Sequence, residues 1–287
     1  MSEDGPRIGL ALGGGGARGL AHIPALQAFD DLGLKPCLIA GTSIGGIFGA
    51  AYAAGRPAAD IRRAVEAITV DDPNGRSRLR LPRKFGWLDL LSLDLGRGSL
   101  VGVDKFLEQY MNAIGVKTFE ELEIPLRLVA GEYWSHEEIV FERGDLAKAV
   151  RASMSLPGVF HPVVDEDRVY VDGGCVNPVP FDLLSGRCDV TVAVDVVGQR
   201  GGHPGEIPNL VDSIFNTFQI MGRSITREKR RRFPPTIYIE PRILDVGLLE
   251  FHRAAEIFAS ADRAREELRS DLETVVAAVR RGSRAGA

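Results

Sequence analysis

Apolar residues near the start of the chain fall into short runs, separated by glycine-rich turns and amphipathic stretches. The run RIGLAL (residues 7–12) leads into GGGGARG (13–19), and KPCLIA (35–40) leads through GTS into the apolar segment 44–54. The stretch after the first glycines has apolar residues at helical spacing, at Leu20, Ile23, Leu26 and Phe29. This order predicts strand, helix, strand and helix, and hence a right-handed βαβ unit with parallel strands.

The same two kinds of pattern continue to the end of the chain. Further strands are predicted at residues 126–130, 137–141, 169–171, 190–194 and 236–239. Apolar residues at helical spacing predict helices at residues 104–111, 145–152, 210–229 and 249–280. We find no internal repeat and no linker. The pattern therefore predicts an α/β protein, with one domain over residues 1–287 as the simplest organisation.

One segment, residues 71–98, departs from this alternation because it is rich in glycine and proline. It contains the apolar stretch WLDLLSLDL, which begins at Trp87 and ends at Leu95. A long irregular connection of this kind is often a lid or a binding loop. The stretch is interpreted either as an apolar lip that contacts acyl chains or a membrane surface, or as an edge strand of a packed insertion.

Composition and charge describe an ordinary water-compatible chain. Of its 287 residues 45% are hydrophobic and 26% charged, and the net charge of −4 gives no overall field that would attract nucleic acid. A local basic run begins at Arg227 and ends at Arg232; it is either a solvated helix end or a contact for anionic lipid headgroups. No apolar stretch approaches the ~18 residues of a membrane span.

The N-terminus and the cysteines predict a cytoplasmic location. MSEDGPR carries acids where a signal peptide carries bases. Cys37, Cys175 and Cys188 are widely scattered, and this indicates neither a disulfide framework nor a zinc site. We therefore expect reduced cysteines in a cytoplasmic protein that could also contact a membrane peripherally.

The first glycine-rich turn fits a dinucleotide-binding pattern only in part. Gly14, Gly16 and Gly19 satisfy G-x-G-x-x-G between a strand and a helix. The second strand, however, lacks the acid that would hold a ribose, since Asp30 and Asp31 precede it instead. No Gly-Lys-Ser/Thr follows the glycines, which excludes a P-loop. The loop remains a cradle for an anion, either a phosphate or an oxyanion.

The second turn presents a serine between glycines. Gly41, Ser43 and Gly45 form G-x-S-x-G at a strand-to-helix junction, which is the setting of a nucleophile elbow. The alternative is a glycine-rich turn in which Ser43 only caps the helix. If the first two strands are neighbours, the anion cradle lies beside Ser43, as acyl transfer requires.

A nucleophilic serine needs a base, and the histidines offer no obvious one. None lies in a distinctive turn; they are His22, His136, His161, His203 and His252. By contrast, a predicted strand delivers Asp172 into Gly173 and Gly174. Asp172 is a candidate base, with an ordinary Asp-Gly hairpin turn as the alternative.

Four blocks, in this order, resemble the patatin-like phospholipase family, in its compact bacterial single-domain type. They are GGGGARG from Gly13, GTSIGG from Gly41, ASMSLPGVF from Ala152 and DGG from Asp172. The resemblance implies a three-layer α/β/α sandwich with a mostly parallel sheet. It further implies an esterase that cleaves phospholipids or related lipids without metal or cofactor.

The resemblance also implies roles for individual residues. Ser43 would be the nucleophile and Asp172 the base that activates it. The first loop would form the oxyanion hole, with Gly14, Gly15, Gly16 and Arg18. The block ASMSLPGVF is expected near the site, but no chemistry is assigned to it.

Three other classes stay open at this point. The fold could bind lipid without catalysis, or the chain could be a Ser-His-Asp hydrolase with a late histidine, His203 or His252. A nucleotide-binding protein would need an acid that the second strand does not supply. Neither the particular ester nor the oligomeric state is predicted.

Overall fold

The computed structural model describes residues 5–67, 69–70, 78–79, 99–197, 205, 207 and 210–285. Most of the expected insertion at residues 71–98, including the stretch from Trp87 to Leu95, lies outside these residues, so its role stays a prediction. The organisation as one domain likewise stays a prediction. Within the described residues, no helix is both long enough and apolar enough to span a bilayer.

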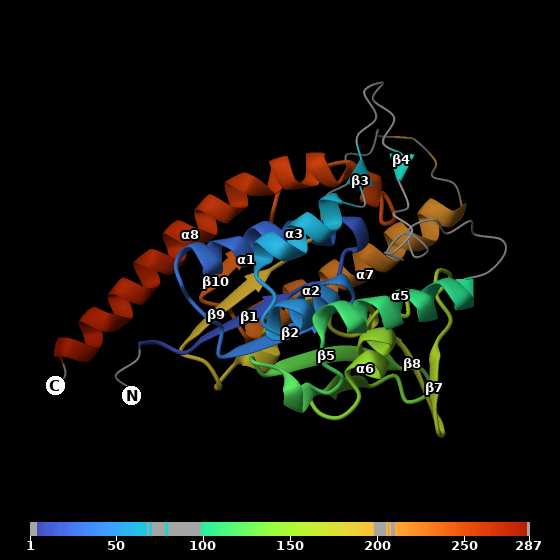
Figure 1. Cartoon of the computed structure of the whole chain (residues 1–287), viewed down its shortest axis with the longest axis horizontal. Coiled ribbons are helices and arrows are strands. Elements are labelled where there is room, and N and C mark those ends of the chain that lie inside the picture. The colour runs from blue at the N-terminus through green and yellow to red at the C-terminus, as the bar shows by residue number, and fades with distance from the viewer. Residues whose placement is uncertain are drawn as a thin grey trace.

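The centre of the molecule is a mixed sheet (Figure 1). Its strands are β1 (Ile8–Leu12), β2 (Leu38–Thr42), β5 (Leu126–Glu132), β6 (Glu138–Phe141), β7 (Val163–Asp165), β8 (Arg168–Asp172), β9 (Val190–Val194) and β10 (Ile237–Ile239). They follow the order β10–β9–β1–β2–β5–β8–β7, with β6 also paired to β5. A separate small ladder joins β3 (Thr69–Val70) to β4 (Arg78–Leu79).

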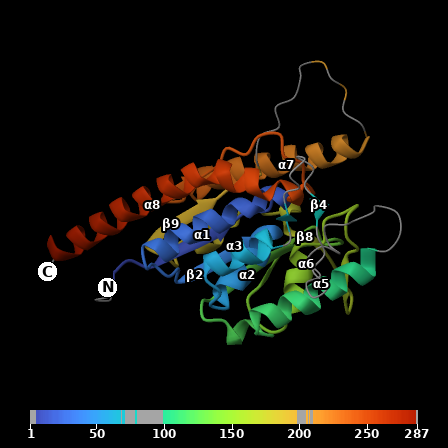
Figure 2. The same ribbon diagram turned by 45° about the horizontal axis from the view of Figure 1, so that its top comes forward.

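Helices cover this sheet unequally. The α-helices are α1 (His22–Asp31), α2 (Ile44–Ala53), α3 (Ala58–Glu66), α5 (Ser99–Ile114), α6 (Leu146–Ser153), α7 (Leu210–Arg232) and α8 (Ala254–Ala285). The 3₁₀ turns are η1 (Gly16–Ala21), η2 (Phe119–Glu121), η3 (Gly173–Cys175), η4 (Phe181–Leu184) and η5 (Phe251–Arg253). Figures 1 and 2 show α1, α3 and α8 stacked together over one face.

The two faces of the sheet bury cores of very different size. On the first face, helices α1, α2 and α8 and the strands share one large apolar cluster that includes Leu10, Phe29 and Phe258. On the other face, η4 places Phe181 and Leu184 over small residues of the central strands. The expected α/β/α fold class is confirmed, with the second helical layer much thinner than the first.

The strands divide into a parallel and an antiparallel part. Strands β10, β9, β1, β2 and β5 are parallel, as the βαβ pattern predicts. Strands β6, β7 and β8 are antiparallel to their neighbours. The pattern did not predict α3 or β7, and it contains nothing that would reveal the direction of β8.

The register across β5 positions the ends of two strands. Thr42, the last residue of β2, is opposite Val129 of β5. The next residue of β5, Ala130, is opposite Asp172, the last residue of β8. Ser43 follows Thr42 directly, so the sheet brings Ser43 and Asp172 to the same level from opposite strand directions.

Candidate active site

Ser43 occupies a strained turn between β2 and α2. Its φ of 55° and ψ of −125° lie outside the regions that non-glycine residues normally adopt. Such a conformation costs about 1–3 kcal/mol and is retained where the surroundings impose it. A Cβ at Gly45 would overlap the carbonyl oxygen of Leu12, which explains the glycine after the serine. At Gly41 a Cβ would lie 2.7 Å from the Cα of Gly46, so the turn is too tight for a side chain there.

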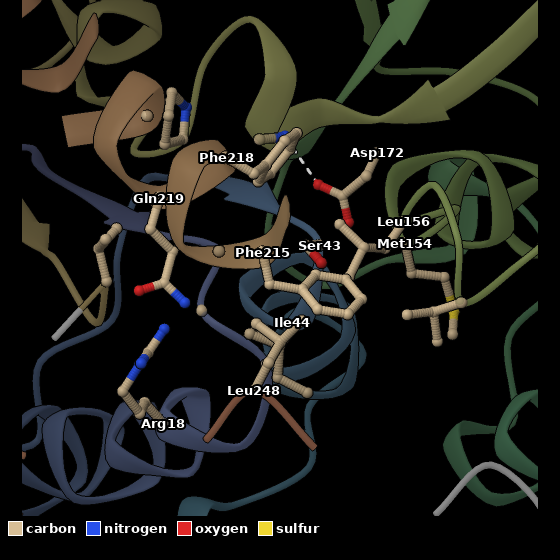
Figure 3. A pocket seen from close by; sticks show the side chains of 18 of the residues that line it. Arg18, Ser43, Ile44, Met154, Leu156, Asp172, Phe215, Phe218, Gln219 and Leu248 are labelled. Atoms are coloured by element: carbon tan, nitrogen blue, oxygen red, sulfur yellow. Dashed lines mark hydrogen bonds between the residues drawn. The ribbon is translucent and has the colours of Figure 1, made fainter. Parts of the chain in front are cut away.

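Asp172 ends β8 and begins η3, and its side chain is 2% exposed. The carboxylate accepts a hydrogen bond from the Gly174 N–H at 2.7 Å (Figure 3). The Ser43 side chain and the Gly174 N–H both lower the pKa of Asp172, but burial outweighs them and raises it to about 6. A Cβ at Gly173 would overlap the carbonyl oxygen of Val129, so the DGG turn fits tightly against β5.

The glycine loop lies directly beside the serine, as its place after β1 predicts. A Cβ added to Gly14 would lie 3.4 Å from the Cβ of Ser43. The Gly14 N–H is nevertheless donated to the Pro178 carbonyl at 2.8 Å, so it is not free to hold an oxyanion. Within the described residues, the N–H groups of Gly15 and Gly16 have no such acceptor. The expected set of loop donors therefore needs revision at Gly14.

Arg18 lines the same pocket, and its side chain is almost fully buried. Its Nε donates to the Val196 carbonyl at 3.3 Å and its Nη1 to the Val246 carbonyl at 3.1 Å. Figure 3 shows the guanidinium directed toward Gln219 of α7. Arg18 therefore ties the glycine loop to two other segments, in addition to placing positive charge in the pocket.

The histidines are elsewhere. His22 is buried, and its Nε2 lies 2.7 Å from the Gly13 carbonyl oxygen. Burial lowers the pKa of His22 to about 4, so the ring is neutral at pH 7. Its contact with Gly13 anchors the glycine loop to α1. No histidine lines the pocket within the described part of the chain. This part includes His252, in η5, whereas His203 lies outside it.

The pocket in front of Ser43 is mainly apolar. Helix α7 contributes Phe215 and Phe218 to the wall that Ser43 also lines (Figure 3). The other apolar side chains come from the ends of several elements: Ile44, Ile47, Met154, Leu156, Val159, Phe160, Pro178, Val197, Leu248, Leu249 and Phe251. A hydroxyl, a carboxylate and a guanidinium therefore lie in a wall that otherwise suits a hydrocarbon chain.

The comparison with protein families agrees with this geometry. The model of a family described as patatin-like phospholipase matches residues 10–185, more than half of the chain. The chain belongs to the patatin-like phospholipase family. All four sequence blocks fall inside the matched range, which confirms the resemblance drawn from them.

Relatives and a solved structure extend this finding. An uncharacterised NTE family protein of Mycobacterium tuberculosis is 34% identical over 69% of this chain and 51% of its own length. A protein of Aspergillus fumigatus named lysophospholipase nte1 is 28% identical over 88% of this chain and 18% of its own. VipD of Legionella pneumophila shares the fold with a TM-score of 0.54, at 14% identity over 94% of this chain and 67% of its own. The chain thus spans about half the length of its mycobacterial relatives.

Two polar residues that support the turn at Ser43 were not predicted from the sequence. The Ser153 hydroxyl accepts a hydrogen bond from the Ser43 N–H at 2.9 Å. The Thr42 hydroxyl donates to the Asn177 carbonyl at 2.8 Å, which ties the elbow to the segment after DGG. Ser153 belongs to the block ASMSLPGVF, so the family resemblance marked the segment without indicating what it does.

Most of the cationic side chains in the basic run at the end of α7 contact other side chains of the protein. Lys229 forms ion pairs with Glu138 at 3.0 Å and Asp182 at 2.9 Å. Arg230 lies 3.9 Å over the ring of Tyr238. The two arginines at the end of the helix, Arg231 and Arg232, both pair with Glu228. These contacts favour the interpretation as a helix end over a surface devoted to lipid headgroups.

All three cysteines are free, and the Cys37 and Cys188 sulfur atoms lie 3.3 Å apart. Within the residues that the structure describes, no group of three or more His, Cys, Asp or Glu side chains is arranged to bind a metal. The cytoplasmic location and the absence of a cofactor stay predictions.

Proposed function

We propose that this chain is a serine esterase that cleaves carboxylic esters of phospholipids, lysophospholipids or related lipids. The observation that carries the proposal is that the register across β5 brings Ser43 level with the buried carboxylate of Asp172, and both residues line one pocket. Family membership supports it, as does the name lysophospholipase borne by the fungal relative. That relative is far longer than this chain, so its name suggests a substrate class and no more.

In the proposed first step, Asp172 accepts the Ser43 proton while the serine oxygen attacks the ester carbonyl carbon. A pKa of about 6 suits this role, because the carboxylate is ionised at pH 7 and is more basic than an exposed aspartate. The strained turn places Ser43 in the wall of the pocket that Asp172 also lines. No histidine is needed between the two groups.

The negative charge that develops on the carbonyl oxygen would be held by the glycine loop. Gly15 and Gly16 offer N–H groups without another acceptor among the described residues. The N-terminus of α2, which begins at Ile44, adds partial positive charge next to Ser43. Losing one donor of this kind costs about 3–4 kcal/mol of transition-state stabilisation.

The intermediate then collapses as Asp172 returns its proton to the leaving alcohol or lysolipid. A water molecule, deprotonated by Asp172, attacks the acyl-Ser43 ester; Asp172 then returns that proton to the Ser43 oxygen as the fatty acid leaves. The apolar side chains from α7 and from residues 154–160 would hold the acyl chain during both steps. The substrate class therefore follows from the wall of the pocket, and the reaction class from Ser43 and Asp172.

Contact with a membrane surface remains part of the proposal. Of the basic run, Arg227 is exposed and forms none of the ion pairs described above. Hydrogen exchange with and without anionic vesicles would test this contact. Protection of the end of α7 is expected if it contacts lipid, and unchanged exchange would remove the idea.

Hydrolysis of a lysophospholipid and of a chromogenic ester tests the proposal. We expect Ser43→Ala and Asp172→Asn each to reduce turnover by about 10⁴-fold or more while the protein stays folded. Asp165→Asn is the matched control, because Asp165 ends the neighbouring strand β7 and pairs with Lys148 outside the pocket. Lipid binding without turnover by the wild type would favour a binding module instead.

A further inference from the structure

Two residues at the end of α6 and just after it contact the backbone of Ser43 and of Asp172. The Ser153 hydroxyl accepts from the Ser43 N–H at 2.9 Å. Two residues later, the Ser155 carbonyl accepts from the Asp172 N–H at 3.0 Å. One short segment therefore holds the serine and the aspartate at the same time.

The contact with Ser43 acts where the chain is under strain. Ser43 has a positive φ of 55°, which is costly for a residue with a side chain. Its N–H points to Ser153, whose side chain is fully buried, so water cannot easily replace the hydroxyl. Removing that hydroxyl leaves the Ser43 N–H without its acceptor and loosens the turn that aims the serine at Asp172.

The segment itself is well fixed. The Ser155 hydroxyl donates to the Arg151 carbonyl at 2.7 Å, and the Met154 N–H donates to the Val150 carbonyl at 3.1 Å, so residues 153–155 continue the last turn of α6. Helix α6 packs on α2, β5 and β8, which are the elements that carry Ser43 and Asp172 or lie between them. The position of α6 is therefore set by the same elements that determine the distance between Ser43 and Asp172.

We propose that residues 153–155 set the distance and orientation between Ser43 and Asp172, with Ser153 as the positioning residue. This inference rests on the proposed function and adds a role for the block ASMSLPGVF. The alternate side chains of the block serve the substrate, because Met154 and Leu156 line the pocket. The block thus holds the reacting pair with its serines and shapes the pocket with its apolar residues.

The first test is the kinetics of Ser153→Ala. We expect kcat for ester hydrolysis to fall on the order of 100-fold, as for a small misplacement of reacting groups, with KM little changed. Ser153→Cys keeps the size but offers a weaker acceptor, so its kcat should fall between those of Ser153→Ala and the wild type. Ile237→Val is the stability control, since Ile237 is buried in β10 away from the pocket.

The pH profile separates positioning from a loss of stability. The Ser43 side chain lowers the pKa of Asp172, so displacing it should move the acid limb of kcat/KM to higher pH in Ser153→Ala. The charge of Asp172 acts in turn on the Cys175 thiol, which stays neutral because burial raises the pKa of Cys175 to about 12. Ile237→Val should lower the melting temperature and leave the limb in place.

Each outcome decides something. Wild-type kcat in Ser153→Ala would overturn the inference. The inference would also be overturned if kcat in Ser153→Ala fell only in proportion to the loss of folded protein and the acid limb did not move. The rate of labelling by a fluorophosphonate distinguishes the two proposals: a wild type that is labelled no faster than Ser153→Ala contradicts only the positioning role, whereas a wild type that is not labelled contradicts the esterase and this inference together.

Discussion

The serine and the aspartate at the centre of this molecule are prepared for chemistry in different ways. Ser43 is half-buried and sits in a backbone conformation that is strained by the turn between β2 and α2. Asp172 has an ordinary φ of −50° but is almost completely buried. Backbone geometry therefore places the nucleophile, whereas removal from water tunes the pKa of the base.

We expect the largest loss from a substitution in the turn that carries Ser43. A methyl group at Gly45 would overlap the Leu12 carbonyl, so Gly45→Ala should lower the free energy of unfolding by about 4 kcal/mol or more and abolish activity. Gly33→Ala is the control, because a Cβ at Gly33 would meet nothing within 4 Å, so only the positive φ of 61° opposes the side chain there. It should cost only about 1 kcal/mol. Equal losses in urea unfolding would contradict the close packing at the elbow.

A smaller effect is expected from the buried carboxyl of Asp172, through the pH dependence of stability. The folded-state pKa of Asp172 is raised from 3.8 to about 6, so this carboxyl favours the folded state at low pH and that contribution is lost as the pH rises through about 6. Asp172→Asn should therefore stabilise the protein by about 3 kcal/mol at pH 8 and by far less at pH 4. Urea unfolding at both pH values checks this, and a gain that does not depend on pH would contradict it.

The same shift predicts a smaller effect on the activity of the wild type. Asp172 must be ionised to accept a proton, so kcat/KM should fall about tenfold per pH unit below about 6 and level off above it. Initial rates with a substrate that does not itself titrate would measure this. A limb near pH 4 would mean that burial does not tune the carboxylate.

The smallest effect concerns the histidines. His252 lies in η5 and does not line the pocket, so His252→Ala should change kcat/KM by less than about twofold, as for a surface substitution. We predict the same for His203→Ala. A loss of several hundred-fold in either variant would instead support a Ser-His-Asp hydrolase and leave Asp172 as a turn residue.

The serine side was easier to predict from sequence than the aspartate side. The G-x-S-x-G turn lies between β2 and α2, and the spacing of apolar residues predicts both elements. The local pattern around Ser43 therefore predicts its surroundings directly. The antiparallel direction of β8 has no local signal, because alternation of apolar residues is the same in either direction. The sequence could offer Asp172 as a candidate, but only the register across β5 brings it level with Ser43.

Single hydrogen bonds lay beyond the sequence for a related reason. The use of the Gly14 N–H by Pro178 depends on where the segment after η3 returns to the glycine loop. The inward turn of Lys229 depends on Glu138 and Asp182, which are distant in sequence. Ser153 reaches Ser43 across 110 positions of the chain. Contacts of this range are set by the packed fold, and local pattern does not encode them.

Intact-protein mass spectrometry after treatment with a fluorophosphonate tests the central claim most directly, because the probe reacts only with an activated serine. The Ser43–Asp172 pair predicts one adduct on the wild type, none on Ser43→Ala and much slower labelling of Asp172→Asn. A folded wild type that gains no adduct, or an adduct that persists in Ser43→Ala, would contradict it.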